Sequence, residues 1–185
     1  MSIIRASQTE AENLSRSTLY RRYHGGDLER VGRGLYISAD ARVADWDQAE
    51  AALLRPESTI SLISALNHFG LTDQIPDALD VAIPRGTRSP VTSGAIRWRQ
   101  FDRETFFLER SEITIAGTGE SIGMYSAART IADCFRMRAS IGYEVPRDAL
   151  KEWLRRGGKP ADLMRIASML PRSKAPVLQA LDILS

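Results

Sequence analysis

A helix signal followed at once by a hairpin signal, near the start of the chain, most constrains the fold. Ser15 is a good N-cap residue, and residues 16–24 place Leu19 and Tyr23 four positions apart, on one side of a helix. The glycine pair at 25–26 can end this helix, because glycine adopts a left-handed backbone without strain. We therefore expect a helix of about nine residues with one apolar side.

The hairpin signal is a pair of short apolar runs, 28–31 and 35–37, around the sequence Gly-Arg-Gly at 32–34. Residues 9–14, just before the expected helix, are also helix-prone. Two short helices followed by a β-hairpin is the order of a winged helix-turn-helix domain. In such a domain the second helix enters the major groove and the hairpin lies along the phosphate backbone. Only eight residues precede Thr9, so the helix that normally packs behind these two is expected to be short or missing.

Basic residues concentrate in this segment, although the net charge of the 185-residue chain is only +2. Between residues 15 and 38 there are five arginines and two acids. A second stretch, 84–99, holds four arginines and no acid. Two basic stretches in a nearly neutral protein indicate binding to a polyanion.

The arginines of the first stretch are expected to divide between two tasks. Those on the second helix can grip guanine or phosphate with their planar fork, and those on the hairpin can neutralise phosphates. The predicted DNA contacts are Arg16, Thr18, Arg21, Arg22, Arg30 and Arg33. The arginines predicted to extend this surface, or to bind another acidic partner, are Arg85, Arg88, Arg97 and Arg99. Trp98 would point to the opposite side of a strand from its neighbours, so we expect it in the core.

The rest of the chain predicts a mixed α/β domain with a helical end. The expected helices cover 46–54, 58–69, 125–137, 147–156, 160–170 and 174–184, and the expected strands cover 79–83, 96–98 and 113–115. We therefore predict an α+β protein, with a winged-helix module over residues 1–40 and an α/β domain over 41–185. Within that domain, Arg129 and Asp133 stand four apart in an apolar stretch and are expected to form a buried ion pair.

Composition argues for a cytoplasmic protein. The chain is 43% hydrophobic and 26% charged, a balance typical of globular proteins. No apolar run reaches the roughly 20 residues needed to span a bilayer. A lone cysteine, Cys134, cannot form an internal disulfide and fits a reducing compartment.

Nothing in the sequence predicts an enzyme. The two histidines, His24 and His68, have no second histidine or cysteine at a metal-ligand spacing. The glycine-rich stretch 117–121 lacks the strand–helix context of a nucleotide-binding loop and is expected to be a turn. We predict neither a metal nor a cofactor.

Four segments resemble the AbiEi family of antitoxins from type IV toxin–antitoxin systems. They are GDLERVGRGLY at 26–36, ISLISALNHFGLTDQIP at 60–76, VAIPRGTR at 81–88 and ARTIADCF at 128–135. The segments occur in the family's order and extend over most of the chain.

This resemblance implies a transcriptional regulator. Its winged helix would bind double-stranded DNA at the protein's own promoter and repress it. The C-terminal part would oppose a nucleotidyltransferase-type toxin, through direct contact or indirectly.

Two other functions remain open at this point. The first is a protein-interaction module, in which the α/β domain binds the toxin or another protein and the winged helix is vestigial. The second is a nuclease or nucleotidyltransferase that uses Asp77, Asp80 and Glu120, which would require these carboxylates to converge on a metal ion.

Overall fold

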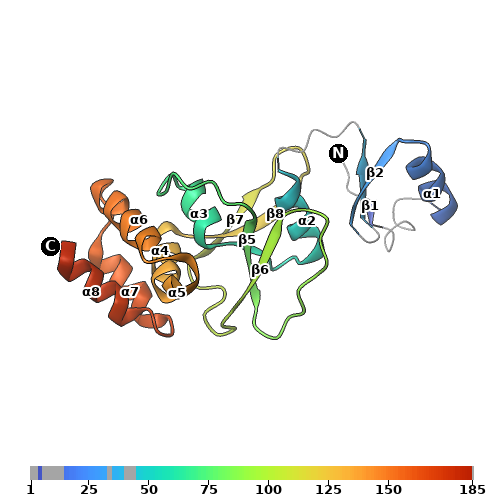
Figure 1. Cartoon of the computed structure of the whole chain (residues 1–185). Helices are drawn as coiled ribbons and strands as arrows, with labels where there is room; N and C mark the ends of the chain where they lie inside the picture. Colours follow the sequence, from blue (N-terminus) through green and yellow to red (C-terminus); the bar gives the residue numbers. More distant parts are fainter. Residues whose placement is uncertain (1–3, 6–14, 33–34, 40–44, 185) are drawn as a thin grey trace.

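The computed structural model describes residues 4–5, 15–32, 35–39 and 45–184. We call the first three of these ranges the N-terminal module and residues 45–184 the body. Figure 1 shows the module at one end of the molecule and the last helices of the body at the other. The predicted domain boundary at residue 40 lies outside the described residues.

The N-terminal module contains one helix against a small antiparallel sheet. Its elements are β1 (Ile4–Arg5), α1 (Arg16–His24), β2 (Leu28–Gly32) and β3 (Leu35–Ser38), with strand order β1-β3-β2. The Ser15 hydroxyl caps α1 by accepting a hydrogen bond from the Thr18 backbone N–H at 3.1 Å. After the helix, Gly26 has φ +82°, the left-handed conformation that favours glycine. The predicted helix 16–24 and the two hairpin strands are thus confirmed.

One strand of this region was not predicted, and two of the predictions for it fall on residues outside the described ranges. β1, which pairs with β3, was not expected from the sequence. The predicted helix at 9–14 and the hairpin turn at 33–34 lie outside the described residues.

The body is built on a five-stranded mixed sheet. Its strands are β4 (Thr59–Ile60), β5 (Leu79–Pro84), β6 (Ile96–Phe101), β7 (Arg110–Thr114) and β8 (Ser121–Tyr125), in the order β6-β5-β4-β8-β7. The β5–β6 and β4–β8 pairs are parallel and the other two pairs are antiparallel. Helix α2 (Trp46–Leu54) packs Ala49 and Ala52 into the same cluster as Val81 and Met124, and so covers one face of this sheet. The predicted α+β class is confirmed.

A helical layer completes the body and holds its larger core. The helices are α3 (Leu62–His68), α4 (Ala127–Arg136), α5 (Arg138–Ile141), α6 (Glu144–Arg155), α7 (Pro160–Met169) and α8 (Lys174–Leu184). The fully buried Ile131 and Phe135 of α4 lie in one cluster with Leu150 of α6, Leu163 of α7 and Val177 of α8. Figure 1 shows α6, α7 and α8 beside α4, at the end of the body away from the module. The predicted helical end is confirmed.

Three predicted helices are wrong at their starts, among them the helix expected over 147–156, which begins at Glu144. The expected helix 58–69 is in fact β4 followed by α3, and Tyr125, expected to begin a helix, ends β8. Thr59 pairs with Ala82 on one side and with Gly123 on the other. These partners lie more than 20 residues away in sequence, so the local pattern does not reveal β4.

The predicted ion pair between Arg129 and Asp133 is confirmed. Arg129 Nε lies 2.7 Å from an Asp133 carboxylate oxygen, and both side chains are 1% exposed. Arg129 also donates to the carbonyl oxygens of Thr105 and Leu108, at 2.8 and 2.9 Å. This arginine therefore ties α4 to the segment that connects β6 and β7.

Candidate nucleic-acid interface

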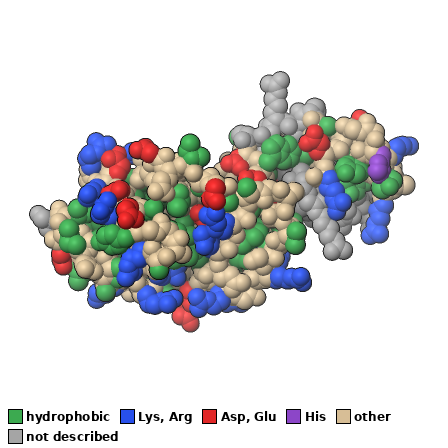
Figure 2. Space-filling model, viewed as in Figure 1, with side chains coloured by type: hydrophobic (Ala, Val, Ile, Leu, Met, Phe, Trp, Pro, Cys, Tyr) green, Lys and Arg blue, Asp and Glu red, His purple; other side chains and the backbone are tan. Residues whose placement is uncertain are grey.

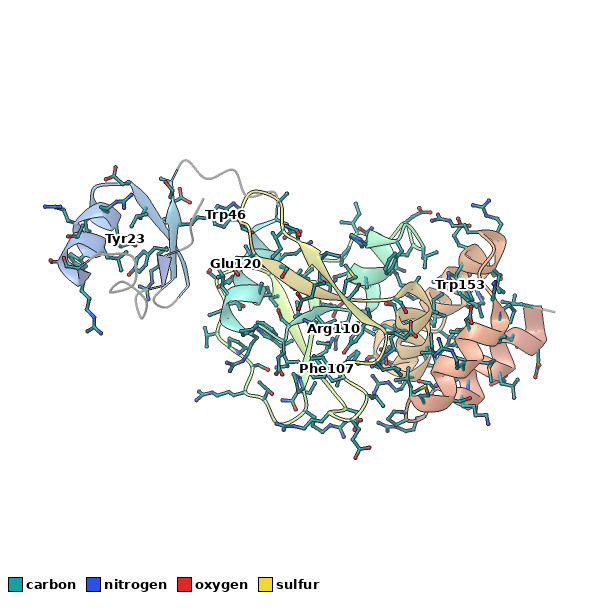
Figure 3. All side chains as sticks on the ribbon, turned by 180° about the vertical axis from the view of Figure 1, so that it is seen from behind. Tyr23, Trp46, Phe107, Arg110, Glu120 and Trp153 are labelled. Carbon is teal, nitrogen blue, oxygen red and sulfur yellow. The ribbon has the colours of Figure 1, made fainter. Side chains whose placement is uncertain are left out.

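The apolar side of α1 fixes which residues face outward. Leu19 is 5% exposed and packs on Leu28 of β2, and the ring of Tyr23 lies 5.5 Å from that of Tyr36 on β3. Figure 3 shows Tyr23 between the helix and the strands. With about 100° of rotation per helical residue, Arg21 projects about 160° from both Leu19 and Tyr23. Arg21 is accordingly exposed, at the centre of the outward face.

The other predicted α1 contacts flank this centre. Arg16 is exposed at the helix start, whereas Thr18 and Arg22 are half-buried. The Thr18 hydroxyl lies 2.9 Å from the Ser15 hydroxyl, so it takes part in the local cap. Arg22 projects about 100° to one side of Arg21, toward the wall of any groove that the helix would enter. The two neighbouring arginines, predicted alike from the sequence, therefore occupy different positions.

The electrostatics of α1 suit an anionic partner. In the part of the chain that the structure describes, Arg16, Arg21 and Arg22 make no ion pair with a carboxylate. Arg21 and Arg22 fall in the last helical turn, where their charges also offset the negative end of the helix dipole. Figure 2 shows Lys and Arg side chains around the outer end of the module.

Of the two hairpin arginines predicted to bind DNA, the structure describes Arg30. Arg33 lies outside the described residues. Arg30 is exposed on β2, and it lines a hollow of about 340 Å³ whose opposite wall includes Asp47 and Glu50 of α2. Asp47 itself has a raised pKa, because burial disfavours its charge and Asp45 and Glu50 repel it. The structure thus places Arg30 near body carboxylates and does not group it with the α1 arginines.

The two strand arginines of the second basic stretch are paired with acids. Arg97 donates to both carboxylate oxygens of Asp77 at 2.8 Å, and Arg99 Nε lies 3.0 Å from Asp80 on the adjacent strand. The Arg97 guanidinium lowers the pKa of Asp77 by hydrogen bonding, whereas burial raises the pKa of Asp80 despite Arg99. Trp98 points to the other face and packs against the core, as predicted. These two arginines therefore stabilise the sheet edge and offer little charge to an external anion.

The two turn arginines belong to a different group. Arg85 and Arg88 are exposed in the β5–β6 connection, where their carbonyl oxygens accept hydrogen bonds from Arg103 Nε and Arg55 Nη2, each at 2.7 Å. Four arginines from three segments thus meet here. The sequence gives no sign of Arg55 and Arg103, because only the folded chain brings them to this connection. Figure 2 shows basic side chains along this lower border of the body.

An exposed aromatic side chain on α1 was also missed. Tyr20 is 67% exposed, and its ring lies 4.2 Å from the His24 ring one turn later. Its outward direction follows from the same periodicity that buries Leu19 and Tyr23, so the sequence does contain the signal.

The acids of the nuclease hypothesis do not form a metal site in the described part of the chain. Asp77 and Asp80 share Arg97, which lies 2.8 Å from the first and 3.7 Å from the second. Among the described residues, no three His, Cys, Asp or Glu side chains come together as metal ligands. No helix within the described ranges is long and apolar enough to span a membrane.

The comparisons with known proteins show the fold alone. The chain is similar to the RV2827C protein from Mycobacterium tuberculosis, known from its crystal structure, with a TM-score of 0.65 and 15% sequence identity. The match covers 98% of this chain and 72% of that one. No family model and no curated protein sequence matches the chain. The shared fold agrees with the mixed α+β architecture.

Proposed function

We propose that the protein binds double-stranded DNA through α1. The observation that carries this proposal is that Arg16, Arg21 and Arg22 of α1 have no carboxylate partner among the described residues, with Arg21 at the centre of the outward face. Several arginines of the body, such as Arg97, Arg155 and Arg165, are instead paired with acids. Exposed arginines that the fold itself does not use are available for phosphates and base edges.

The module is proposed to act as a winged helix. In support, a strand, a helix and a hairpin follow one another, and β1 and the hairpin form one sheet behind α1. This leaves the outward face of α1 to enter the major groove. Phosphate contacts would supply most of the affinity, and Arg21 would supply base contacts, since it lies at the centre of that face.

The hairpin and the body have smaller parts in this proposal. Asp47 and Glu50 near Arg30 repel phosphates, so α1 contributes more than β2. The turn arginines, Arg85 and Arg88, offer a second phosphate-binding surface.

The regulatory role rests on the four segments that resemble AbiEi antitoxins. On that basis we propose a repressor of its own promoter that opposes a nucleotidyltransferase-type toxin, and not an enzyme. A protein-interaction module is the second candidate. The observation that favours it is the place of Arg30, beside body carboxylates.

A fluorescence-anisotropy titration tests DNA binding. The full chain would be titrated against its own upstream promoter duplex and a scrambled duplex, at two salt concentrations. We expect tighter binding to the promoter, and binding to both duplexes should weaken with salt because phosphates release counterions. Equal or absent binding would remove the regulator and favour the interaction module. An assay of co-purification with the product of an adjacent nucleotidyltransferase gene would then follow.

A further inference from the structure

Tyr20 is a large aromatic side chain that the fold does not use. It is 67% exposed on α1, and its hydroxyl has no hydrogen-bond partner within the described residues. The nearby Tyr23, by contrast, packs on Tyr36. Aromatic side chains with a polar tip are typical of surfaces that contact a partner.

His24 holds the Tyr20 ring in place. The two residues stand four apart, so they are neighbours on the helix surface, and their ring centroids lie 4.2 Å apart at an interplanar angle of 58°. The His24 ring also contacts Tyr23, at 5.2 Å edge to face. Tyr20 is therefore supported, through His24, by a side chain anchored in the module core.

The direction of Tyr20 relates it to the proposed DNA contacts. Tyr20 projects about 100° from Arg21, on the side opposite to Arg22, which also lies about 100° away. Exposed Arg16 precedes Tyr20 by one turn on the same side. If Arg21 points to the floor of a groove, then Tyr20 and Arg22 point to its two walls, and these walls are sugar-phosphate backbone.

We propose that the Tyr20 hydroxyl donates a hydrogen bond to a backbone phosphate at one wall of the groove, and that His24 is the positioning residue for its ring. This inference rests on the proposed DNA binding by α1. Tyrosine is among the side chains that contact phosphates in protein–DNA complexes. Because its hydroxyl is neutral, it contributes affinity without neutralising a charge.

The test is Tyr20→Phe, which removes only the hydroxyl of an exposed side chain. Affinity for the promoter and the scrambled duplex should fall by the same factor, roughly tenfold, the usual size for a hydrogen bond to a charged group. The slope of log affinity against log salt should not change, because that slope counts neutralised phosphates. Tyr143→Phe, at a tyrosine that is 39% exposed in the body, is the matched control and should bind as the wild type does.

A second variant tests the role of His24. His24→Ala should weaken binding in the wild-type background and have no further effect in the Tyr20→Phe background, because both changes remove one contact. Additive losses would mean that His24 contacts DNA on its own account and would overturn the positioning role.

The outcomes separate the two proposals. Wild-type protein that binds neither duplex overturns DNA binding, and the Tyr20 contact with it. Wild-type protein that binds, together with a Tyr20→Phe variant of equal affinity, overturns the Tyr20 contact alone. A loss confined to the promoter duplex would place Tyr20 against a base and would also contradict the phosphate assignment.

Discussion

Arginine has different roles in the two parts of the molecule. In the body, Arg129 is 1% exposed and pairs with Asp133, while Arg97 and Arg99 pair with Asp77 and Asp80. On α1 of the module, arginines are exposed or half-buried and none pairs with a carboxylate in the described part of the chain. The same side chain therefore stabilises the fold at these positions of the body and is available to an external anion on α1, as it is at Arg85 and Arg88 of the β5–β6 connection.

This difference explains why overall charge says little about this protein. The net charge is +2, because the carboxylates of the body offset most of its arginines. What an approaching polyanion meets is the local excess on α1 and at the β5–β6 connection. Substitutions that remove either an arginine or its carboxylate partner, in each part of the molecule, test this difference.

The largest effect is expected at the buried ion pair. Asp133→Ala leaves Arg129 and Arg136, which are 1% and 8% exposed, without their carboxylate. Breaking a buried pair from one side typically costs about 3–5 kcal/mol of unfolding free energy. Urea unfolding of the full chain measures this loss of unfolding free energy. Asp148→Ala is the control, because Asp148 pairs with Arg147 at the surface. That variant should change stability by less than about 1 kcal/mol. Similar losses from both variants would show that burial does not distinguish these arginines.

The next effect separates the two neighbouring arginines of α1. Arg21→Ala should reduce the preference for the promoter over scrambled DNA by about 10- to 100-fold, as for loss of a base contact. Arg22→Ala should weaken binding to both duplexes alike and lower the salt slope by about 1. Anisotropy titrations over a salt series measure both quantities. Arg155→Ala, at an exposed arginine of the body paired with Glu152, should leave them unchanged. Identical behaviour of the Arg21 and Arg22 variants would contradict the division between floor and wall.

Whether the sequence could predict an element depends on whether nearby or distant residues stabilise that element. The bounds of α1, α2 and α8 follow from caps, glycines and apolar spacing, all of which act within a few residues. The strand β4 was missed, because both of its neighbours lie far away in the chain. The strand β8 was missed although one of its neighbours, β7, is close in sequence, with Thr114 paired to Ser121.

The candidate site shows the same limit. The exposed position of Arg21 follows from helical periodicity. The pairing of Arg99 with Asp80 depends on the register between β5 and β6, which only the folded sheet defines. Sequence reasoning therefore located the basic segments, but it did not separate the arginines that the fold uses from those that remain available.

The smallest effect concerns two acids that share Arg97 but differ in burial. Burial raises the pKa of Asp80 above 3.8, so the native state binds this proton more tightly than the unfolded state does. The resulting stabilisation is present at low pH and is lost as pH rises from about 3.8 through the raised value. Each unit of pKa shift corresponds to about 1.4 kcal/mol. Relative to Asp80→Asn, the wild type should therefore lose unfolding free energy over that pH interval and show a constant difference above it.

Asp77 is the control, because its pKa is shifted in the opposite direction to that of Asp80. Hydrogen bonds from Arg97 lower its pKa, so its stabilisation is present above 3.8 and is lost as pH falls through the lowered value. Its side chain is 81% exposed, and solvent screening keeps the effect small. Urea unfolding at pH values from 3 to 7, for the wild type, Asp80→Asn and Asp77→Asn, measures both. The stability difference between the wild type and Asp80→Asn could change with pH in the same direction as the difference for Asp77→Asn. In that case, the effect of Arg99 on the pKa of Asp80 would be larger than the effect of burial. Arg97 and Arg99 would then stabilise the charged form of Asp80 more than burial destabilises it.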